Sequence, residues 1–182
     1  KMSISLVILD RDRDINQDFD NYIKSVDEWH TIADSIDAIA RLSQAGYRVM
    51  VVTNQSGLAR GYFDEMTLAN MHGYMCSLVE SAGGDIEAIF YCPHAPGDDC
   101  HCRKPLPGML NQIEEEFNLS VHNAFLVGDS EKDIDVGLAK QCRPILVRTG
   151  KGASTEKKLE LQKKKRIQIV DDLAAAVDFI LT

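Results

Sequence analysis

Two carboxylates stand two residues apart, directly after an apolar run. The stretch LVILDRD, residues 6–12, places Asp10 and Asp12 behind four apolar residues. In extended backbone, side chains two residues apart point to the same side, so these carboxylates would lie close together. Like charges at that distance repel unless a cation lies between them or one carboxyl group is protonated. The pair therefore indicates a cation site, and oxygen ligands of this kind suit Mg²⁺.

Polar groups that fit the same chemistry follow other apolar runs. Thr53 offers a hydroxyl group, and the amides of residues 54–57 can face an anion. Lys104, in CRKPLPG, offers a positive charge, while Asp129 and Asp133, in GDSEKD, add carboxylates. Solvated loop acids are the alternative for one such group alone. A cation, a hydroxyl and a lysine around a carboxylate favour phosphoryl transfer, which needs several fixed donors and cations around the transferring oxygens.

A second metal site is predicted in the segment CPHAPGDDCHC. Its ligands would be Cys92, His94, Cys100 and Cys102, a Cys₃His set that is typical of structural zinc. Four protein ligands leave no open coordination position, so we expect the ion to be structural. His101 lies between two ligands and is expected to point away. The alternative is a loop of unligated cysteines, which would be exposed to oxidation.

The zinc segment leads directly into two basic residues, Arg103 and Lys104. We therefore expect the zinc ion to fix the part of the chain that carries them. The remaining two of the five cysteines, Cys76 and Cys142, fall in helix-like segments. They are expected to be buried thiols without a chemical role.

The elements that position these groups alternate between strands and helices. Apolar runs predict strands, and amphipathic patterns predict helices, with Asp34 and Asp64 as the residues that cap two of the helices. The predicted strands are 4–9, 47–52, 86–91, 124–127, 144–148 and, at the edge, 167–170, and the predicted helices are 34–45, 64–82, 107–117, 131–141 and 172–181. This alternation predicts an α/β fold, a Rossmann-like doubly wound parallel sheet with ligands beyond the carboxyl ends of its strands.

The gaps between the chemical residues leave no room for a cap domain. The segment from Asp10 to Thr53 holds one loop and one helix, and the segment from Thr53 to Lys104 holds a helix, a strand and the zinc loop, 92–102. We therefore expect a capless fold with an open site. The length of 182 residues suits a single domain over residues 1–182.

Composition narrows the functional class. The formal net charge is −8, which argues against nucleic acid as a partner and requires local cations to attract an anionic substrate. No apolar run approaches the roughly 18 residues of a membrane span, and the N-terminus lacks a signal-peptide pattern. We expect a soluble, cytoplasmic monomer without membrane contacts. The basic run at 157–166 is interpreted as a solvated helix or linker.

The order of these motifs resembles the haloacid dehalogenase-like phosphatase superfamily. The resemblance rests on Asp-x-Asp after the first strand, Thr after the second, Lys before a helix and GDSEKD after the fourth strand, and it spans residues 4–150. It implies that Asp10 is a nucleophile that forms an aspartyl-phosphate. Asp12 would protonate the leaving group and then activate water, and Thr53 and Lys104 would hold the phosphoryl group.

The same resemblance implies the ligands of the magnesium ion. Asp129 would bind Mg²⁺ together with Asp10 and the backbone carbonyl group of Asp12. Asp133 would hold this set of ligands in position.

Two positions depart from the pattern of that superfamily. Relatives usually carry Gly and then Thr or Val after the second Asp, whereas this chain has Arg13 and Asp14. Arg13 is compatible with the fold if its φ is not positive, and Asp14 if it turns away or meets an arginine. Relatives often have Lys after the fourth-motif Asp, where this chain has Ser130, and Lys132 is a candidate substitute.

Within the superfamily, LDRD, TNQSGLARG, CPH and CHCRKPLPGM resemble the phosphatases of D-glycero-D-manno-heptose 1,7-bisphosphate, which serve bacterial surface polysaccharide synthesis. The alternatives are a histidinol-phosphate phosphatase or a non-catalytic phosphosugar-binding relative. The resemblance implies a phosphorylated sugar as substrate and Arg103 as a contact, and a guanidinium group suits a second phosphate. Arg60 is a further candidate cation. The expected substrate contacts are Asp18, Asn21, Thr53, Asn54, Gln55, Ser56, Arg103 and Lys104.

Overall fold

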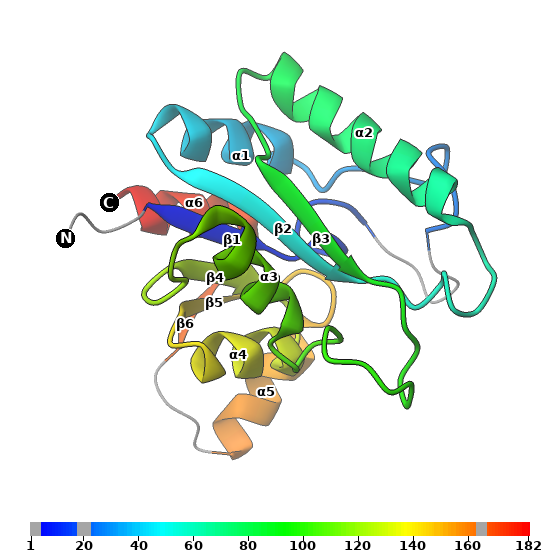
Figure 1. Cartoon of the computed structure of the whole chain (residues 1–182). Coiled ribbons are helices and arrows are strands. Elements are labelled where there is room, and N and C mark those ends of the chain that lie inside the picture. Colours follow the sequence, from blue (N-terminus) through cyan, green and yellow to red (C-terminus); the bar gives the residue numbers. More distant parts are fainter. Residues whose placement is uncertain (1–4, 18–22, 163–166) are drawn as a thin grey trace.

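Six parallel strands form the sheet in the described part of this computed structural model, which comprises residues 5–17, 23–162 and 167–182 (Figure 1). The strand order is β3-β2-β1-β4-β5-β6, and every neighbouring pair is parallel. The strands are β1 (Leu6–Leu9), β2 (Arg48–Asn54), β3 (Ala88–Cys92), β4 (Phe125–Gly128), β5 (Arg143–Val147) and β6 (Gln168–Val170). The predicted doubly wound α/β fold is confirmed.

Six helices cover the two faces of the sheet within the same described residues. Figure 1 shows α1, α2 and α6 on one side of the sheet and α3, α4 and α5 on the other. The helices are α1 (Ser35–Gln44), α2 (Glu65–Ser81), α3 (Gly108–Phe117), α4 (Glu131–Ala139), α5 (Gly152–Leu161) and α6 (Leu173–Leu181). None of these helices is long and apolar enough to cross a membrane.

Alternate residues of each central strand enter two different cores. Val7 and Leu9 of β1 pack among side chains of α1, α2 and α6, whereas Leu6 and Ile8 pack with α3 and part of α4. Successive side chains of a strand point to opposite faces, so a strand buried on both faces is apolar throughout. This explains the continuous apolar run before Asp10.

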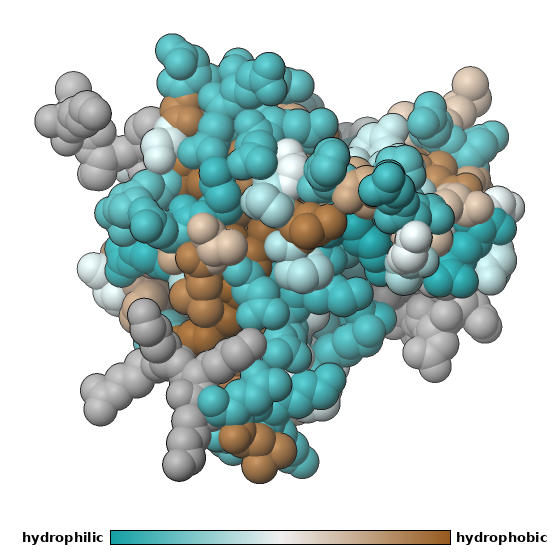
Figure 2. All heavy atoms as spheres, turned by 60° about the horizontal axis from the view of Figure 1, so that its bottom comes forward, coloured by the Kyte–Doolittle hydropathy of each residue, from teal (hydrophilic) through white to brown (hydrophobic). Residues whose placement is uncertain are grey.

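Apolar side chains are concentrated in these cores, and the face turned forward in Figure 2 is mainly hydrophilic, with one broader apolar area left of centre and smaller ones elsewhere. Cys142 is buried, as expected, whereas Cys76 is only half-buried. Cys76 is not among the buried residues of α2.

The helix ends test the predicted caps. Asp64 caps α2, because its carboxylate accepts the backbone N–H of Thr67 at 2.8 Å. Asp34 precedes α1 but does not cap it with its side chain: its backbone is left-handed, with φ 65°, and the carboxylate makes no capping hydrogen bond. The predicted cap position is therefore correct, but the side-chain hydrogen bond expected of a capping Asp is absent, because residue type alone does not report the backbone angle there.

One helix is not among the predicted ranges, although the basic run at 157–166 is interpreted from the sequence as a helix or linker. Helix α5 covers residues 152–161, so the basic run is partly helical, and residues 163–166 lie outside the described part of the chain. Its pattern is weakly amphipathic, since only Gly152, Thr155 and Leu159 of its ten residues are buried. Its position after β5 places it beside the carboxyl ends of the central strands.

Candidate active site

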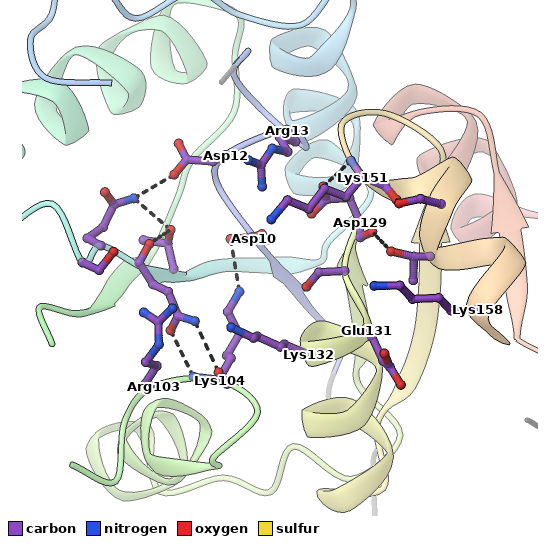
Figure 3. A pocket seen from close by; sticks show the side chains of 17 residues that line it. Asp10, Asp12, Arg13, Arg103, Lys104, Asp129, Glu131, Lys132, Lys151 and Lys158 are labelled. Carbon is purple, nitrogen blue, oxygen red and sulfur yellow. Dashed lines mark hydrogen bonds and ion pairs between the residues drawn. The ribbon is translucent and has the colours of Figure 1, made fainter. Parts of the chain in front are cut away.

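The carboxyl ends of β1, β2 and β4 bring the predicted residues together around one lysine (Figure 3). The Nζ atom of Lys104 lies 3.1 Å from an oxygen of Asp10 and 2.6 Å from an oxygen of Asp133. It also donates to the carbonyl oxygen of Val52 at 3.2 Å. Burial lowers the pKa of Lys104, but the two carboxylates outweigh that effect and hold it above its usual value. The lysine is therefore a fixed positive charge beside Asp10.

Three carboxylates gather at this point. One oxygen from each of Asp10, Asp129 and Asp133 lies within 4.8 Å of the others. Burial, followed by the charge of Asp133, raises the pKa of Asp129 to about 6. The pKa of Asp10 is also raised well above its usual value, chiefly by burial, although Lys104 opposes the shift. Carboxylates that are this close and this buried fit a divalent cation, which would relieve their repulsion.

Two of these carboxylates, Asp129 and Asp133, are held by hydrogen bonds from nearby residues. The N–H of Lys151 donates to Asp129 Oδ2 at 2.8 Å, and the hydroxyl of Thr155 donates to the Asp129 carbonyl group at 2.8 Å. Asp133 accepts from the backbone N–H and the hydroxyl of Ser130, at 3.2 and 2.9 Å, in the capping box of α4. A side chain at Gly128 would collide with the Asp133 carboxylate, so the close approach requires glycine there.

Asp12 points away from Lys104 and into a separate set of donors. Its Oδ1 atom accepts from Arg11 Nε at 2.9 Å, Arg11 Nη2 at 2.6 Å and Asn16 Nδ2 at 3.0 Å. Its Oδ2 atom accepts from Gln55 Nε2 at 3.1 Å. Burial opposes ionisation, but the charge of Arg11 and these hydrogen bonds bring the pKa of Asp12 below its usual value.

The loop after β2 is tied to its neighbours through side chains. Gln55 Nε2 donates to the Thr53 hydroxyl at 3.0 Å as well as to Asp12. Asn54 joins the Lys104 backbone at two points, since its Oδ1 accepts the N–H at 3.0 Å and its Nδ2 donates to the carbonyl group at 3.4 Å. Ser56 also lies at the site. These contacts join the segment that carries Thr53 to the segment that carries Lys104.

Most of the predicted site residues line one pocket of about 480 Å³, whereas Asp133 lies behind the lining and contacts Lys104. Although the chain carries a net charge of −8, the lining contains six basic residues, so the pocket is a local site for an anion. Arg103 and Lys132, which the sequence singled out, line it, whereas Arg60 is exposed and does not. The remaining basic residues are Arg13, Lys104, Lys151 and Lys158.

Several lining residues were missed by the sequence prediction. They follow β5 or begin α4: Glu131, Lys151, Ser154, Thr155 and Lys158. The rule that ligands bind beyond the carboxyl ends of parallel strands also applies to β5, and it would have found the residues after position 148. The predicted contacts Asp18 and Asn21 lie outside the described residues.

Arg13 and Asp14 correct two expectations. Arg13 does have a positive φ, 70°, and its carbonyl group accepts from the hydroxyl of Thr149. Its side chain lies against Gly150, whose own φ is 57°. Asp14 neither turns toward solvent nor forms a hydrogen bond with an arginine of the described chain: it is fully buried, and neither carboxylate oxygen has a hydrogen-bond partner among the described residues. Burial, followed by the charges of Asp10 and Asp129, raises the pKa of Asp14 well above its usual value.

The cysteine loop forms a second cluster. The sulfur atoms of Cys92, Cys100 and Cys102 lie within 4.8 Å of one another, a donor set that fits zinc. His94 is not within that distance of all three, and His101 is exposed. The loop is joined to the pocket, because Arg103 Nη1 donates to the carbonyl group of His94 at 3.3 Å. A metal ion bound by these cysteines would therefore help to fix Arg103, which lines the pocket.

The six-stranded parallel sheet, with carboxylates and a buried lysine at its switch point, is the arrangement expected of HAD-like hydrolases. The HAD-hydrolase-like family model matches residues 101–176. The D-glycero-beta-D-manno-heptose-1,7-bisphosphate 7-phosphatase of Pseudomonas aeruginosa is 51% identical over 180 residues, which cover 99% of each chain. The corresponding phosphatase of Neisseria meningitidis is 46% identical over 178 residues, 98% of this chain and 95% of that one.

A solved structure gives the same result. The D,D-heptose 1,7-bisphosphate phosphatase of Bordetella bronchiseptica, in complex with magnesium and phosphate, superimposes with a TM-score of 0.93 at 44% identity and 98% coverage of both chains. This chain therefore belongs to the D-glycero-beta-D-manno-heptose-1,7-bisphosphate 7-phosphatase family of HAD-like hydrolases.

Proposed function

We propose that this chain is a magnesium-dependent phosphatase that removes the C7 phosphate of D-glycero-beta-D-manno-heptose 1,7-bisphosphate through an aspartyl-phosphate. The observation that carries the proposal is the meeting of Asp10, Lys104 and two further carboxylates at the floor of a cationic pocket. The names and the magnesium and phosphate of its relatives support this substrate and this ion.

The cation site would use the ends of β1 and β4. Asp10, Asp129 and the backbone carbonyl group of Asp12 would hold Mg²⁺, with Asp133 as the supporting carboxylate. When bound, the ion neutralises negative charge on the phosphoryl oxygens and between the carboxylates. The positive charge of Lys104 is present whether or not the ion is bound.

Asp10 is the proposed nucleophile. One of its carboxylate oxygens forms a bond to phosphorus while the bond between phosphorus and the sugar oxygen breaks. Asp12 gives a proton to that leaving oxygen, and then takes a proton from the water molecule that attacks the phosphorus of the aspartyl-phosphate and releases Asp10. Because Asp12 Oδ1 already accepts three N–H groups, the proton is carried by Oδ2. A dianionic substrate beside Asp12 favours its protonated form.

The other predicted contacts receive distinct roles. Thr53 and Lys104, with the backbone of residues 54–56, would hold the transferred phosphoryl group. Arg103 would bind the second phosphate, because its guanidinium group offers paired donors at the wall of the pocket. Asn54, Gln55 and Ser56 shape that wall, and Asp18 and Asn21 remain proposed substrate contacts.

The cysteine loop is proposed to hold structural Zn²⁺. Its ligands would be Cys92, Cys100 and Cys102, with His94 as the fourth. We propose that residues 1–182 act as one catalytic domain, in which the zinc loop supports the pocket through Arg103.

The experiment is a phosphate-release assay with three substrates, each with and without Mg²⁺. They are the heptose bisphosphate, histidinol phosphate and p-nitrophenyl phosphate. The proposal expects magnesium-dependent release that is fastest with the heptose bisphosphate and stops at one phosphate per sugar. Faster phosphate release from histidinol phosphate would contradict the proposed identity of the substrate. No release from any of the three would contradict catalysis and favour a phosphosugar-binding protein.

A further inference from the structure

Arg11 is a buried arginine within the Asp-x-Asp motif to which the proposed reaction gives no role. Only 1% of it is exposed, and its backbone lies at the start of a tight turn, where its carbonyl group accepts the N–H of Ile15 at 2.9 Å. Its Nε and Nη2 atoms both donate to Asp12 Oδ1, at 2.9 and 2.6 Å. A guanidinium group that donates twice to one oxygen fixes the direction of that carboxylate.

The third nitrogen of this guanidinium group reaches another element. Arg11 Nη1 lies 3.2 Å from Nε2 of His72, which is on α2 and only 8% exposed. Arginine has donors and no acceptor, so His72 Nε2 must be the acceptor and the ring proton must be on Nδ1. Burial, followed by the charge of Arg11, lowers the pKa of His72 to about 3, in agreement with a neutral ring.

The rest of α2 shows that His72 differs from its neighbours. The other residues that α2 buries are Leu68, Met71, Met75 and Val79, all of them in the apolar core. His72 is therefore the polar residue among the buried side chains of this helix, and its recorded hydrogen bond is to Arg11. A buried donor such as Arg11 Nη1 is costly without an acceptor, so the contact restrains the guanidinium group.

We propose that Arg11 and His72 are positioning residues that hold Asp12 Oδ1 away from the pocket and leave Oδ2 to transfer the proton. The chain of contacts runs from α2 through His72 Nε2 and Arg11 to Asp12. The inference rests on the proposed role of Asp12 as acid and base. It adds a residue outside the Asp-x-Asp motif that controls the direction of that carboxylate.

The test uses the dependence of the rate on the leaving group. A sugar alkoxide needs a proton from Asp12 when it leaves, whereas p-nitrophenolate is stable without one. The ratio kcat/KM reports the steps through formation of the aspartyl-phosphate. His72→Phe should lower kcat/KM for the heptose bisphosphate about 10-fold, part of the ~10²–10⁴-fold that proton transfer contributes, and for p-nitrophenyl phosphate less than about 2-fold.

Two further variants separate positioning from packing. His72→Gln retains an acceptor oxygen and should restore the sugar phosphate rate to within about 3-fold of the parent. Met75→Ala, which removes a fully buried side chain from the same helix, should lower thermal stability and leave the ratio of the two substrate rates unchanged. Equal losses for both substrates in His72→Phe, or no recovery in His72→Gln, would overturn the proposal.

A spectroscopic measurement tests the contact between Arg11 and His72 and does not depend on enzyme activity. In protein labelled with ¹⁵N-histidine, the resonances missing from His72→Gln identify His72 among the five histidines. The proposal expects an unprotonated Nε2 and a protonated Nδ1 at neutral pH. A protonated Nε2 would overturn it even if His72→Phe does not fold. If the parent protein releases no phosphate from either substrate, the proposed function fails, and this measurement still decides the Arg11–His72 contact.

Discussion

Lys104 Nζ lies 3.1 Å from the Asp10 carboxylate, although the two residues come from opposite sides of the β2 segment in the sequence. The contact exists because β1 and β2 are neighbours in the sheet and Lys104 donates to Val52 of β2. It places a permanent positive charge beside the proposed nucleophile. The predictions below follow from this arrangement and from its surroundings.

Asp10→Asn should abolish turnover and preserve the fold. Asparagine has almost the same shape but is a poor nucleophile toward phosphorus, so we expect kcat to fall at least about 10³-fold. Phosphate release and a thermal unfolding curve measure the two effects. Asp37→Asn, at an exposed position of α1, is the control. Parental activity in Asp10→Asn would rule out covalent catalysis at this position.

Metal-free protein should lose stability as the pH rises from about 5 to 7. Burial raises the pKa of Asp129 to about 6 in the folded state, so the folded state holds its proton at pH values where the unfolded chain has released it. A raised carboxyl pKa contributes stability that is present at low pH and is lost as the pH passes the folded-state pKa. The expected loss from Asp129 is about 1 kcal/mol.

Urea unfolding at a series of pH values with a chelator present measures this slope. In Asp129→Asn the slope should become smaller, because the amide does not titrate. Added Mg²⁺ should also reduce it, since a cation stabilises the ionised carboxylates. A stability that rises between pH 5 and 7 without metal would contradict the assignment.

Cys100→Ser should remove zinc and reduce activity while changing magnesium affinity less. The sulfur of Cys100 belongs to the three-thiol cluster, and the loop reaches the pocket through Arg103. We expect zinc content to fall from about one to below about 0.1 per chain and kcat/KM to fall at least about 10-fold. Metal analysis and titration of activity with Mg²⁺ measure both, and Cys76→Ser is the control. Full turnover in zinc-free protein would contradict the supporting role.

Gly150→Ala should destabilise the fold through Arg13. A side chain at position 150 would collide with the Arg13 side chain, and the φ of 57° disfavours alanine. We expect a loss of about 1–2 kcal/mol in the free energy of unfolding. In the Arg13→Gly background the same change should cost about 1 kcal/mol less, because the collision is gone. Equal costs in both backgrounds would show that the two residues do not interact.

Much of the site could be predicted from the sequence, because its residues directly follow strands that the local pattern predicts. Asp10 and Asp12 follow an apolar run that is buried on both faces, and parallel strands end at one edge of a sheet, so residues after β1, β2 and β4 could be placed together. The spacing of Cys92, Cys100 and Cys102 likewise predicted a cluster whose sulfurs do meet. Apolar runs and residue spacing are sufficient for such inferences.

Backbone angles and buried polar contacts could not be predicted from apolar runs and residue spacing. The left-handed backbone of Arg13 accompanies contacts between the loop after β1 and the loop after β5. Neither the left-handed backbone of Asp34 nor the burial of Asp14 could be predicted from residue type. The first part of α5 was missed because its pattern is weak, and with it Lys151 and Thr155, which hold Asp129.

By itself, the sequence determined which residues carry the chemistry and at which strand ends they stand, because hydrophobic periodicity fixes strands and helices locally. The tertiary structure alone decided which oxygen of Asp12 faces Arg11, and that His72 of α2 accepts from that arginine. Such contacts join residues far apart in the chain, and their geometry depends on strand order and on side-chain packing between whole elements.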